Sequence, residues 1–350
     1  MNVCIDMNGI IHNCAQEIYE YGNFKKNRLL TKINKITLKN QLKLFGYNDL
    51  FSTFDNLFKN KMMPNSTLLS GPKGIGKSTF IYHFANYVLS KNENFSYSVD
   101  NYEINSENKS YNLVQEGIHS NFYFLEGINL NEKVKVDQVR NLLTFNNKSS
   151  FSKDLKIIVI NNAESLNINS ANALLKVIEE PNENTFFFII HNSFLKILNT
   201  IKSRCVEFKV NHSVDEKLLI YKKLSNFYKL QLDKEIVREN LLYETPGTLI
   251  KFNLIAENLN IESYEKDLKN IYYLIEKTES EKDSRKFTFL FYLVEKLYAS
   301  LCLKNFNNFG KFNQYFANYK KIIYQINNMK VFNLNEKNTL NFIKNILPNE

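Results

Sequence analysis

The stretch that decides the fold lies just after the first strong apolar run and reads Gly71-Pro72-Lys73-Gly74-Ile75-Gly76-Lys77-Ser78, followed by Thr79. It matches the pattern G-x-x-x-x-G-K-[ST] at each fixed position, which is typical of a loop whose backbone N–H groups bind phosphates. In such a loop Lys77 reaches the β- and γ-phosphates, and Ser78 offers its hydroxyl to Mg²⁺. The sequence therefore predicts a nucleotide site at residues 71–79, with an empty vestigial loop as the alternative.

The segments on either side of this loop have the pattern of an α/β domain. Short apolar runs, typical of strands buried in a parallel sheet, occur at Ser66–Ser70, Phe122–Glu126, Leu155–Ile160, Thr185–Ile190 and Val206–Val210. Between them, apolar residues recur at helical spacing over Phe80–Leu89 and Ala171–Ile178, and Pro181 ends the second helix. We therefore expect a five-stranded parallel sheet, covered by helices, with ligands at the carboxyl ends of its strands.

The rest of the chain is expected to form three further segments. Residues 1–38 are an N-terminal extension that is either a short helical piece or lies before the true start of translation. The α/β domain occupies residues 39–210, and two helical segments follow at 211–262 and 263–350. Within the α/β domain, the Asn- and Ser-rich residues 91–121 are expected to be a surface insertion. Near the C-terminus a helix face is expected to pack in a core or against another subunit through Phe306, Phe309, Phe312, Tyr315, Phe316 and Tyr319.

Composition limits the classes of protein to consider. With 44% hydrophobic residues the chain can build substantial cores, and its net charge of +9 is compatible with a nucleic-acid partner. Only five of its 45 basic residues are Arg, however, so we attribute the charge to the codon bias of an AT-rich genome. The four Cys residues form no CxxC pair, which indicates a reducing cytoplasm and neither disulfides nor a zinc site. No apolar run approaches the ~18 residues of a membrane span.

The strand expected at Leu155–Ile160 ends in Asn161-Asn162, where phosphate-loop enzymes place an acidic residue that helps to hold Mg²⁺. An amide is neutral and cannot supply that charge. Glu164 could substitute, although we favour the interpretation that it caps or solvates the following helix. Asn161 and Asn162 are thus degenerate metal and hydrolysis positions, and the sequence predicts nucleotide binding without efficient hydrolysis.

A third feature, Ser203-Arg204-Cys205, stands just before the last expected strand. A structural Arg204 would pair with a local carboxylate. The functional alternative is an arginine finger, which enters the nucleotide site of a neighbouring subunit and neutralises charge on the transferred γ-phosphate. The position of Arg204 in the sequence leaves both interpretations open. Cys205 is expected to be a small buried residue of the strand.

Four segments together resemble the clamp-loader AAA+ subunits of bacterial DNA polymerase III. They are Leu44-Phe45-Gly46, Val136-Asp137-Gln138-Val139-Arg140, Asn172-Ala173-Leu174-Leu175-Lys176-Val177-Ile178-Glu179-Glu180-Pro181 and Ser203-Arg204-Cys205. The resemblance extends over residues 40–210. It is strongest for the family member that does not hydrolyse ATP, because the motor subunits carry acidic residues at the positions of Asn161 and Asn162.

The resemblance implies an AAA+ domain at 39–210, a helical lid at 211–262 and an all-α collar at 263–350 that holds a pentamer together. Its partners would be the gamma/tau and delta subunits, and the complex would load a sliding clamp onto primer-template DNA during replication, away from any membrane. Arg204 would act in trans on the ATP of a neighbour, and the chain itself would bind ATP, with Mg²⁺, without hydrolysing it. The alternative is an active AAA+ motor subunit of the gamma/tau type.

This chain departs from the family pattern at two places. Many relatives carry a four-Cys zinc module after the phosphate loop, but residues 91–121 contain no Cys, so we predict no zinc. Where relatives place a sensing Arg in the lid, the chain reads Pro246-Gly247-Thr248-Leu249-Ile250-Lys251, which further weakens the case for hydrolysis. A small-molecule phosphotransferase could share the same loop, but the sequence offers no convincing catalytic carboxylates for it.

Overall fold

The computed structural model describes residues 3–5, 11–13, 40–126, 134–147, 155–230, 234–258, 268–281, 284–332 and 334–348. The chain divides into two compact units, Met1–Lys251 and Phe252–Glu350. At the start of the first unit, strand β1 (Val3–Ile5) pairs antiparallel with β2 (Ile11–Asn13). The rest of the predicted extension at 1–38 lies outside the described residues.

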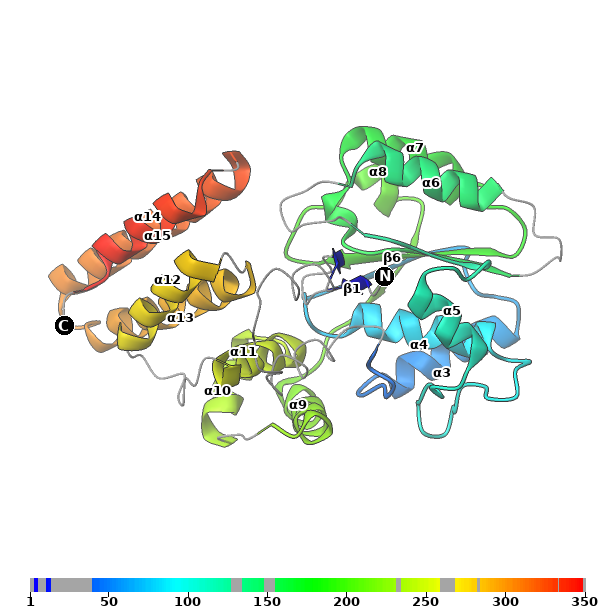
Figure 1. Cartoon of the computed structure of the whole chain (residues 1–350), viewed down its shortest axis with the longest axis horizontal. Helices are drawn as coiled ribbons and strands as arrows, with labels where there is room; N and C mark the ends of the chain where they lie inside the picture. The colour runs from blue at the N-terminus through cyan, green and yellow to red at the C-terminus, as the bar shows by residue number, and fades with distance from the viewer. Residues whose placement is uncertain are drawn as a thin grey trace. The chain divides into compact units, whose positions relative to one another are not determined.

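The centre of the first unit is a five-stranded sheet in the order β4-β5-β6-β3-β7, with all neighbouring strands parallel (Figure 1). The strands are β3 (Ser66–Gly71), β4 (Phe122–Leu125), β5 (Lys156–Ile160), β6 (Thr185–Asn192) and β7 (Val206–Lys209). All five overlap the predicted runs, so the predicted parallel sheet is confirmed. Because the strands are parallel, the residues that follow β3, β4 and β5 meet at one edge of the sheet.

One detail of the strand prediction is wrong. The apolar run at Val206–Val210 was expected to be buried on both faces, but β7 is an edge strand and pairs with β3 alone. Val206 is therefore half exposed, and the opposite edge strand β4 is only partly buried. A run of apolar residues indicates a strand, but it does not reveal which strands lie at the edges of the sheet.

Helices cover both faces of the sheet (Figure 1). One face carries α3 (Asn48–Lys59), α4 (Lys77–Leu89) and α5 (Lys109–Glu116), and the other carries α6 (Val136–Asn147), α7 (Ile168–Glu179) and α8 (Asn199–Lys202). The predicted stripe of α4 is confirmed at Phe80, Ile81 and Phe84, which are buried. Tyr82 and His83 are buried as well, because α4 packs against β6, α3 and α5. The helix that follows the phosphate loop is thus anchored on several sides.

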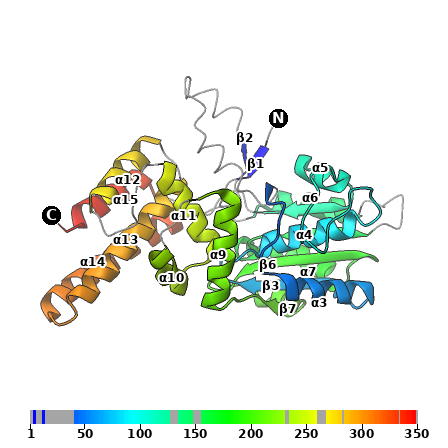
Figure 2. The ribbon, with the colours of Figure 1, turned by 90° about the horizontal axis from the view of Figure 1, so that it is seen from below.

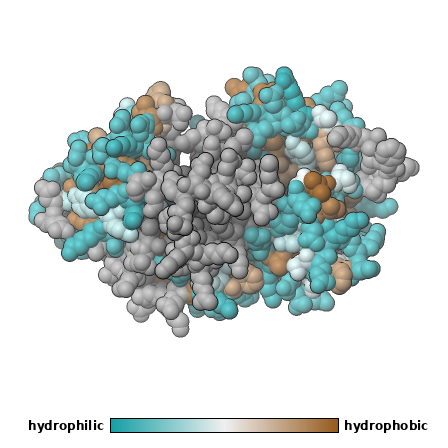
Figure 3. Space-filling model, in the orientation of Figure 1, coloured by the Kyte–Doolittle hydropathy of each residue, from teal (hydrophilic) through white to brown (hydrophobic). Residues whose placement is uncertain are grey.

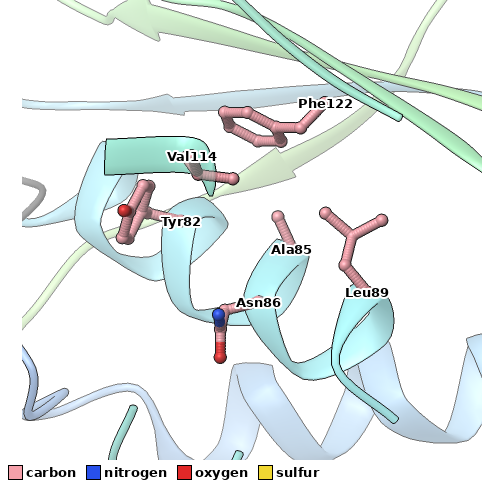
Figure 4. Close-up of a pocket in the computed structure, with 6 residues that line it drawn as sticks. All are labelled: Tyr82, Ala85, Asn86, Leu89, Val114 and Phe122. Atoms are coloured by element: carbon pink, nitrogen blue, oxygen red, sulfur yellow. The ribbon is translucent and has the colours of Figure 1, made fainter. Parts of the chain in front are cut away.

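Residues 91–121 lie largely at the surface, as their Asn and Ser content predicted, but part of the segment belongs to the core. They contain α5, and Tyr97, Ile104 and Val114 are buried in the same core as α3 and α4. Figure 4 shows Val114 of α5 and Phe122 of β4 gathered with residues of α4 around a small apolar recess. Asn108 belongs to the buried part, because it is a fully buried helix cap whose Oδ1 accepts the Tyr111 N–H at 2.7 Å.

Helices α9 (Val214–Tyr228) and α10 (Lys234–Tyr243) and the first turns of α11 (Pro246–Asn258) complete the first unit. A capping box starts α9, since Ser213 Oγ accepts the Glu216 N–H and the Glu216 carboxylate accepts the Ser213 N–H. Ile220 of α9 then packs on Gly46, where a Cβ atom would lie 2.3 Å from Ile220 Cδ1. The boundaries predicted for the lid, 211–262, and for the collar, 263–350, stay a prediction.

The described part of the second unit is helical, with α12 (Leu268–Glu281), α13 (Ser284–Lys304), α14 (Phe309–Phe332) and α15 (Glu336–Ile346). The long helices α13 and α14 pack together, and the turn that joins them, orange in Figure 2, lies at the tip of the pair. Phe306 and Phe309 at this tip are 72% and 78% exposed, so their predicted packing in a core is wrong, and packing against another subunit stays a prediction.

The visible surface of the described residues is mostly hydrophilic, with small hydrophobic patches over both units (Figure 3). Among the described residues, none of the helices combines the length and the hydrophobicity that crossing a membrane requires.

Candidate functional site

The phosphate loop joins β3 to α4 and has the backbone that its glycines predict. Gly74 and Gly76 have φ angles of +77° and +111°, in a region that residues with a Cβ atom rarely adopt. Tyr47, at the start of α3, supports the loop from behind. Its hydroxyl donates to the Ile75 carbonyl at 3.1 Å, and a Cβ atom on Gly76 would lie 3.1 Å from Tyr47 Cε2. The loop is therefore shaped by glycine and held by a buried ring.

Lys77 lies at the first position of α4 with its ammonium group turned into the loop. Nζ donates to the carbonyl oxygens of Gly71 at 2.7 Å and Pro72 at 2.8 Å. Burial lowers the pKa of Lys77 to about 8, with Glu164 opposing this shift and Lys73 adding to it. The two carbonyls are neutral and accept hydrogen bonds from the ammonium group without cancelling its charge, so the loop is suited to binding anions such as phosphates.

Ser78 contacts the strand end where the sequence predicted a degenerate metal position. Its Oγ donates to Asn161 Oδ1 at 2.8 Å. Asn161 Nδ2 donates in turn to Glu126 Oε1, and Asn162 Nδ2 donates to the same oxygen at 2.9 Å. A carboxylate therefore lies one hydrogen bond behind the amide that faces Ser78.

The backbone explains why these groups meet. Asn161 directly follows β5 and Glu126 directly follows β4, and the Asn161 N–H donates to the Leu125 carbonyl at 2.8 Å across the two strands. Asn162 adopts the left-handed conformation, with φ of 51°, which Asn tolerates better than most residues. Sequence reasoning missed Glu126, although it ended the predicted strand Phe122–Glu126. Its relevance depends on the order of the strands, which the sequence alone does not specify.

Glu164 does not cap the helix that follows it, although the sequence favours that interpretation. Asn167, not Glu164, caps α7, with its Oδ1 accepting the Ser170 N–H at 2.7 Å. Glu164 lies in a short 3₁₀ turn, and its Oε2 accepts the N–H of Asn192 at the end of β6, at 3.2 Å. The interpretation of Glu164 as the cap of α7 is therefore wrong. Its carboxylate is instead close enough to the phosphate loop to raise the pKa of Lys77.

The start of α11 packs directly on the phosphate loop. Thr245 Oγ1 donates to the Lys73 carbonyl at 2.9 Å, and the Gly247 N–H donates to the Gly74 carbonyl at 3.1 Å. A Cβ atom on Gly247 would lie only 2.4 Å from that carbonyl oxygen, so this close approach requires glycine. Residues 245–251, which include the segment where relatives place a sensing Arg, thus contact the phosphate loop through the Thr245 hydroxyl and the Gly247 N–H.

Residues 46–213 match a family model described as DNA polymerase III, delta subunit. The chain is 35% identical, over 140 residues, to DNA polymerase III subunit delta' of Pseudomonas aeruginosa. Residues 46–213 are therefore similar in sequence to delta-prime clamp-loader subunits of DNA polymerase III. The match covers 40% of this chain and 41% of the Pseudomonas protein, so the chain spans about two fifths of that relative.

Other proteins to which this chain is similar are more distant. DNA polymerase III subunit gamma of Buchnera aphidicola from Schizaphis graminum is 24% identical over 73% of this chain and 71% of its own length. A solved structure of a gamma-subunit-related protein from Thermotoga maritima covers 84% of this chain and 98% of its own at 17% identity, with a TM-score of 0.41. The resemblance to clamp-loader subunits that the sequence predicted is confirmed by the family model and the Pseudomonas relative.

Arg204 lies in the turn between α8 and β7. Its Nε donates to Glu179 Oε2 at 2.8 Å, and its Nη1 donates to the Thr200 carbonyl at 3.0 Å. The Arg204 and Glu179 side chains are 31% and 56% exposed. Water screens a pair of this kind, which typically contributes about 1 kcal/mol or less. The local carboxylate that the structural interpretation required is present, but it holds Arg204 only weakly.

The structure brings most predicted site residues together and leaves one apart. Residues 71–79, Asn161 and Asn162 lie at the carboxyl ends of the strands. Arg204 precedes β7, whose Val206 pairs with Thr67 at the other end of β3, so it lies at the amino ends. Gly71 lies four positions after Thr67 in β3, a rise of about 13 Å at ~3.3 Å per residue. Among the described residues there is no group of three or more His, Cys, Asp or Glu that could hold a metal ion.

Proposed function

We propose that this chain is a delta-prime-like subunit of a DNA polymerase III clamp loader that helps to load the sliding clamp onto primed DNA. Its proposed partners are the gamma/tau and delta subunits in a cytoplasmic pentamer, with contacts to clamp and DNA made through the complex. The similarity to clamp-loader subunits supports this function. We further propose that 211–262 acts as the lid and 263–350 as the collar. The exposed aromatic tip formed by Phe306 and Phe309 supports subunit contacts in the collar.

The position of Arg204 carries the proposal of a finger that acts in trans. A residue at the amino ends of the strands is separated from the phosphate loop of its own chain by the length of the sheet. Arg204 is, however, partly exposed and only weakly held by its ion pair with Glu179, as a residue that enters a neighbour's nucleotide site needs to be. Arg is suited to this role because its planar guanidinium binds phosphate oxygens with two parallel hydrogen bonds.

We propose that the chain's own site binds ATP but hydrolyses it poorly. Backbone N–H groups of residues 74–79 and the ammonium group of Lys77 would bind the phosphates. Ser78 Oγ and Asn161 Oδ1, at 2.8 Å from each other, are oxygen donors that fit a Mg²⁺ ion at the phosphates. That ion would neutralise phosphate charge. Asn162 supplies an amide and no general base for water, which favours binding over hydrolysis.

A reconstitution experiment tests the proposed function. The purified chain alone should bind ATP and show no turnover above background. Added to purified gamma/tau and delta subunits with clamp and primed DNA, it should raise the ATPase rate of the mixture in proportion to the amount of complex formed. Steady-state phosphate release, with complex formation followed by gel filtration, measures both. A motor mixture that reaches the same rate without this chain would contradict the proposal.

Lys77 provides a test of the nucleotide site itself. Removing a charged donor to phosphate oxygens costs about 1.5–3 kcal/mol, so Lys77→Ala should weaken ATP binding roughly 10- to 150-fold. Titration of a fluorescent ATP analogue into the isolated chain gives the two dissociation constants. Lys59→Ala is the matched control, because Lys59 pairs with Asp55 on α3, and it should bind like the wild type. Equal affinity in Lys77→Ala would show that the loop is vestigial.

The second candidate function is an active motor subunit of the gamma/tau type. The intact phosphate loop and the proximity of Glu164 to Lys77 favour it. It predicts that the isolated chain turns over ATP with Mg²⁺ and that Lys77→Ala abolishes this turnover. ATP binding without measurable phosphate release would exclude it.

A further inference from the structure

The carboxylate of Glu126 is a feature of the nucleotide site that the sequence pattern does not identify. It follows β4 and accepts hydrogen bonds from two neighbouring amides, Asn161 Nδ2 and, at 2.9 Å, Asn162 Nδ2. Asn161 stands at the position where an acidic residue would normally supply negative charge to a phosphate-bound cation, and Asn162 is the residue next to it. The charge missing from the end of β5 is thus present on the adjacent strand.

Glu126 also determines how Asn161 faces the phosphate loop. The NH₂ side of the Asn161 amide faces Glu126 and donates to its carboxyl oxygen, which accepts the hydrogen bond. The other side, Oδ1, is then fixed toward Ser78, whose hydroxyl donates to it at 2.8 Å. The three side chains form a chain of hydrogen bonds from Ser78 through Asn161 to Glu126. A carboxylate behind an amide polarises it and makes its carbonyl oxygen a stronger acceptor.

We propose that Glu126 is a positioning residue of a Mg²⁺-nucleotide site and replaces, through Asn161, the acid that β5 lacks. It turns Asn161 Oδ1 toward the cation position beside Ser78. The negative charge comes from Glu126 itself, which is separated from that position by Asn161. The inference deepens the proposed ATP-binding function and rests on it. It distinguishes two effects of Glu126 that have opposite signs: attraction of the divalent cation and repulsion of a triphosphate that carries no cation.

Because Glu126 attracts the cation but repels a triphosphate without one, nucleotide binding with and without Mg²⁺ distinguishes this role from a merely structural one. The dissociation constant of a fluorescent ATP analogue is measured on the full chain in Mg²⁺ and in EDTA, and the ratio of the two constants gives the tightening due to Mg²⁺. In Glu126→Gln this tightening should fall about tenfold, while binding in EDTA stays equal or becomes stronger. A loss of fold would weaken binding under both conditions.

An exchange of the two groups provides the rescue. The double variant Glu126→Gln with Asn161→Asp keeps one carboxylate and one amide in contact but places the carboxylate directly against Ser78. Its Mg²⁺ tightening should return at least to the wild-type ratio. Asn161→Asp alone sets two carboxylates against each other, and it should have a lower melting temperature than the double variant.

The outcomes separate the two proposals. If the wild-type chain binds the analogue in neither condition, the proposed ATP-binding function fails, and the role of Glu126 fails with it. If the chain binds and the Mg²⁺ tightening is the same in wild type and Glu126→Gln, the role of Glu126 is overturned while ATP binding stands. A smaller ratio in Glu126→Gln that the exchange variant does not restore also overturns it.

Discussion

Arg204→Ala is expected to lower the clamp- and DNA-stimulated ATPase rate of the reconstituted clamp loader by about 10³-fold, the lower end of the range for arginine fingers. The guanidinium would stabilise charge on the γ-phosphate of a neighbouring subunit, and Ala offers no positive charge there. Because Arg204 lies at the amino ends of the strands, ATP binding to its own chain should not change. Steady-state phosphate release by the complex, beside nucleotide titration of the isolated chain, separates these two effects.

Two control variants distinguish a finger from a structural ion pair. Arg140→Ala removes another exposed Arg that pairs with a local carboxylate, Asp137 at 2.9 Å, and it should leave the rate unchanged. Glu179→Gln breaks the pair that holds Arg204 while keeping the guanidinium. If Arg204 acts only by pairing with Glu179, Glu179→Gln should be as inactive as Arg204→Ala. If Arg204 is a finger, Glu179→Gln should retain most of the rate.

The sequence predicted the parts of this fold that depend on local pattern. Five apolar runs became the five strands, and the loop at 71–78 had the backbone that its glycines require. Errors arose where burial depends on tertiary contacts. Asn108 and Tyr97 lie in a stretch whose composition is typical of a loop, yet both are buried, because Asn can cap a helix internally and Tyr can fill a core.

The candidate site was predictable in its residues but not in its connections. Ser78 and Asn161 were both identified, since one lies in a recognisable loop and the other follows a recognisable strand. That β4 lies beside β5, and so brings Glu126 to Asn161, follows from the order of the strands in the sheet. Arg204 lies at the amino ends of the strands, away from the phosphate loop at their carboxyl ends. This placement follows from the parallel pairing of β7 with β3, which the sequence does not reveal. Neither is encoded by residue spacing.

Phe54→Ala is expected to destabilise the first unit strongly, because it removes a fully buried ring from an aromatic core. Phe54 of α3 is fully buried, and its ring lies 5.0 Å from those of Phe80 and Phe208 and 5.3 Å from that of Phe84. Truncating a buried Phe to Ala typically costs about 3–5 kcal/mol, through lost burial and the cavity that remains. That is a large share of the roughly 5–15 kcal/mol that stabilises a domain.

The loss should reach the nucleotide site, because α3 carries Tyr47 at its start and Tyr47 holds the phosphate loop through the Ile75 carbonyl. Urea unfolding followed by circular dichroism should show a lower midpoint for the first transition, and saturating ATP should recover part of the difference. Phe54→Leu keeps most of the volume and should cost less than half as much. Phe194→Ala, at a residue that is 81% exposed, should unfold like the wild type. A midpoint for Phe54→Ala equal to that of Phe194→Ala would mean that α3 does not anchor the loop through this aromatic cluster.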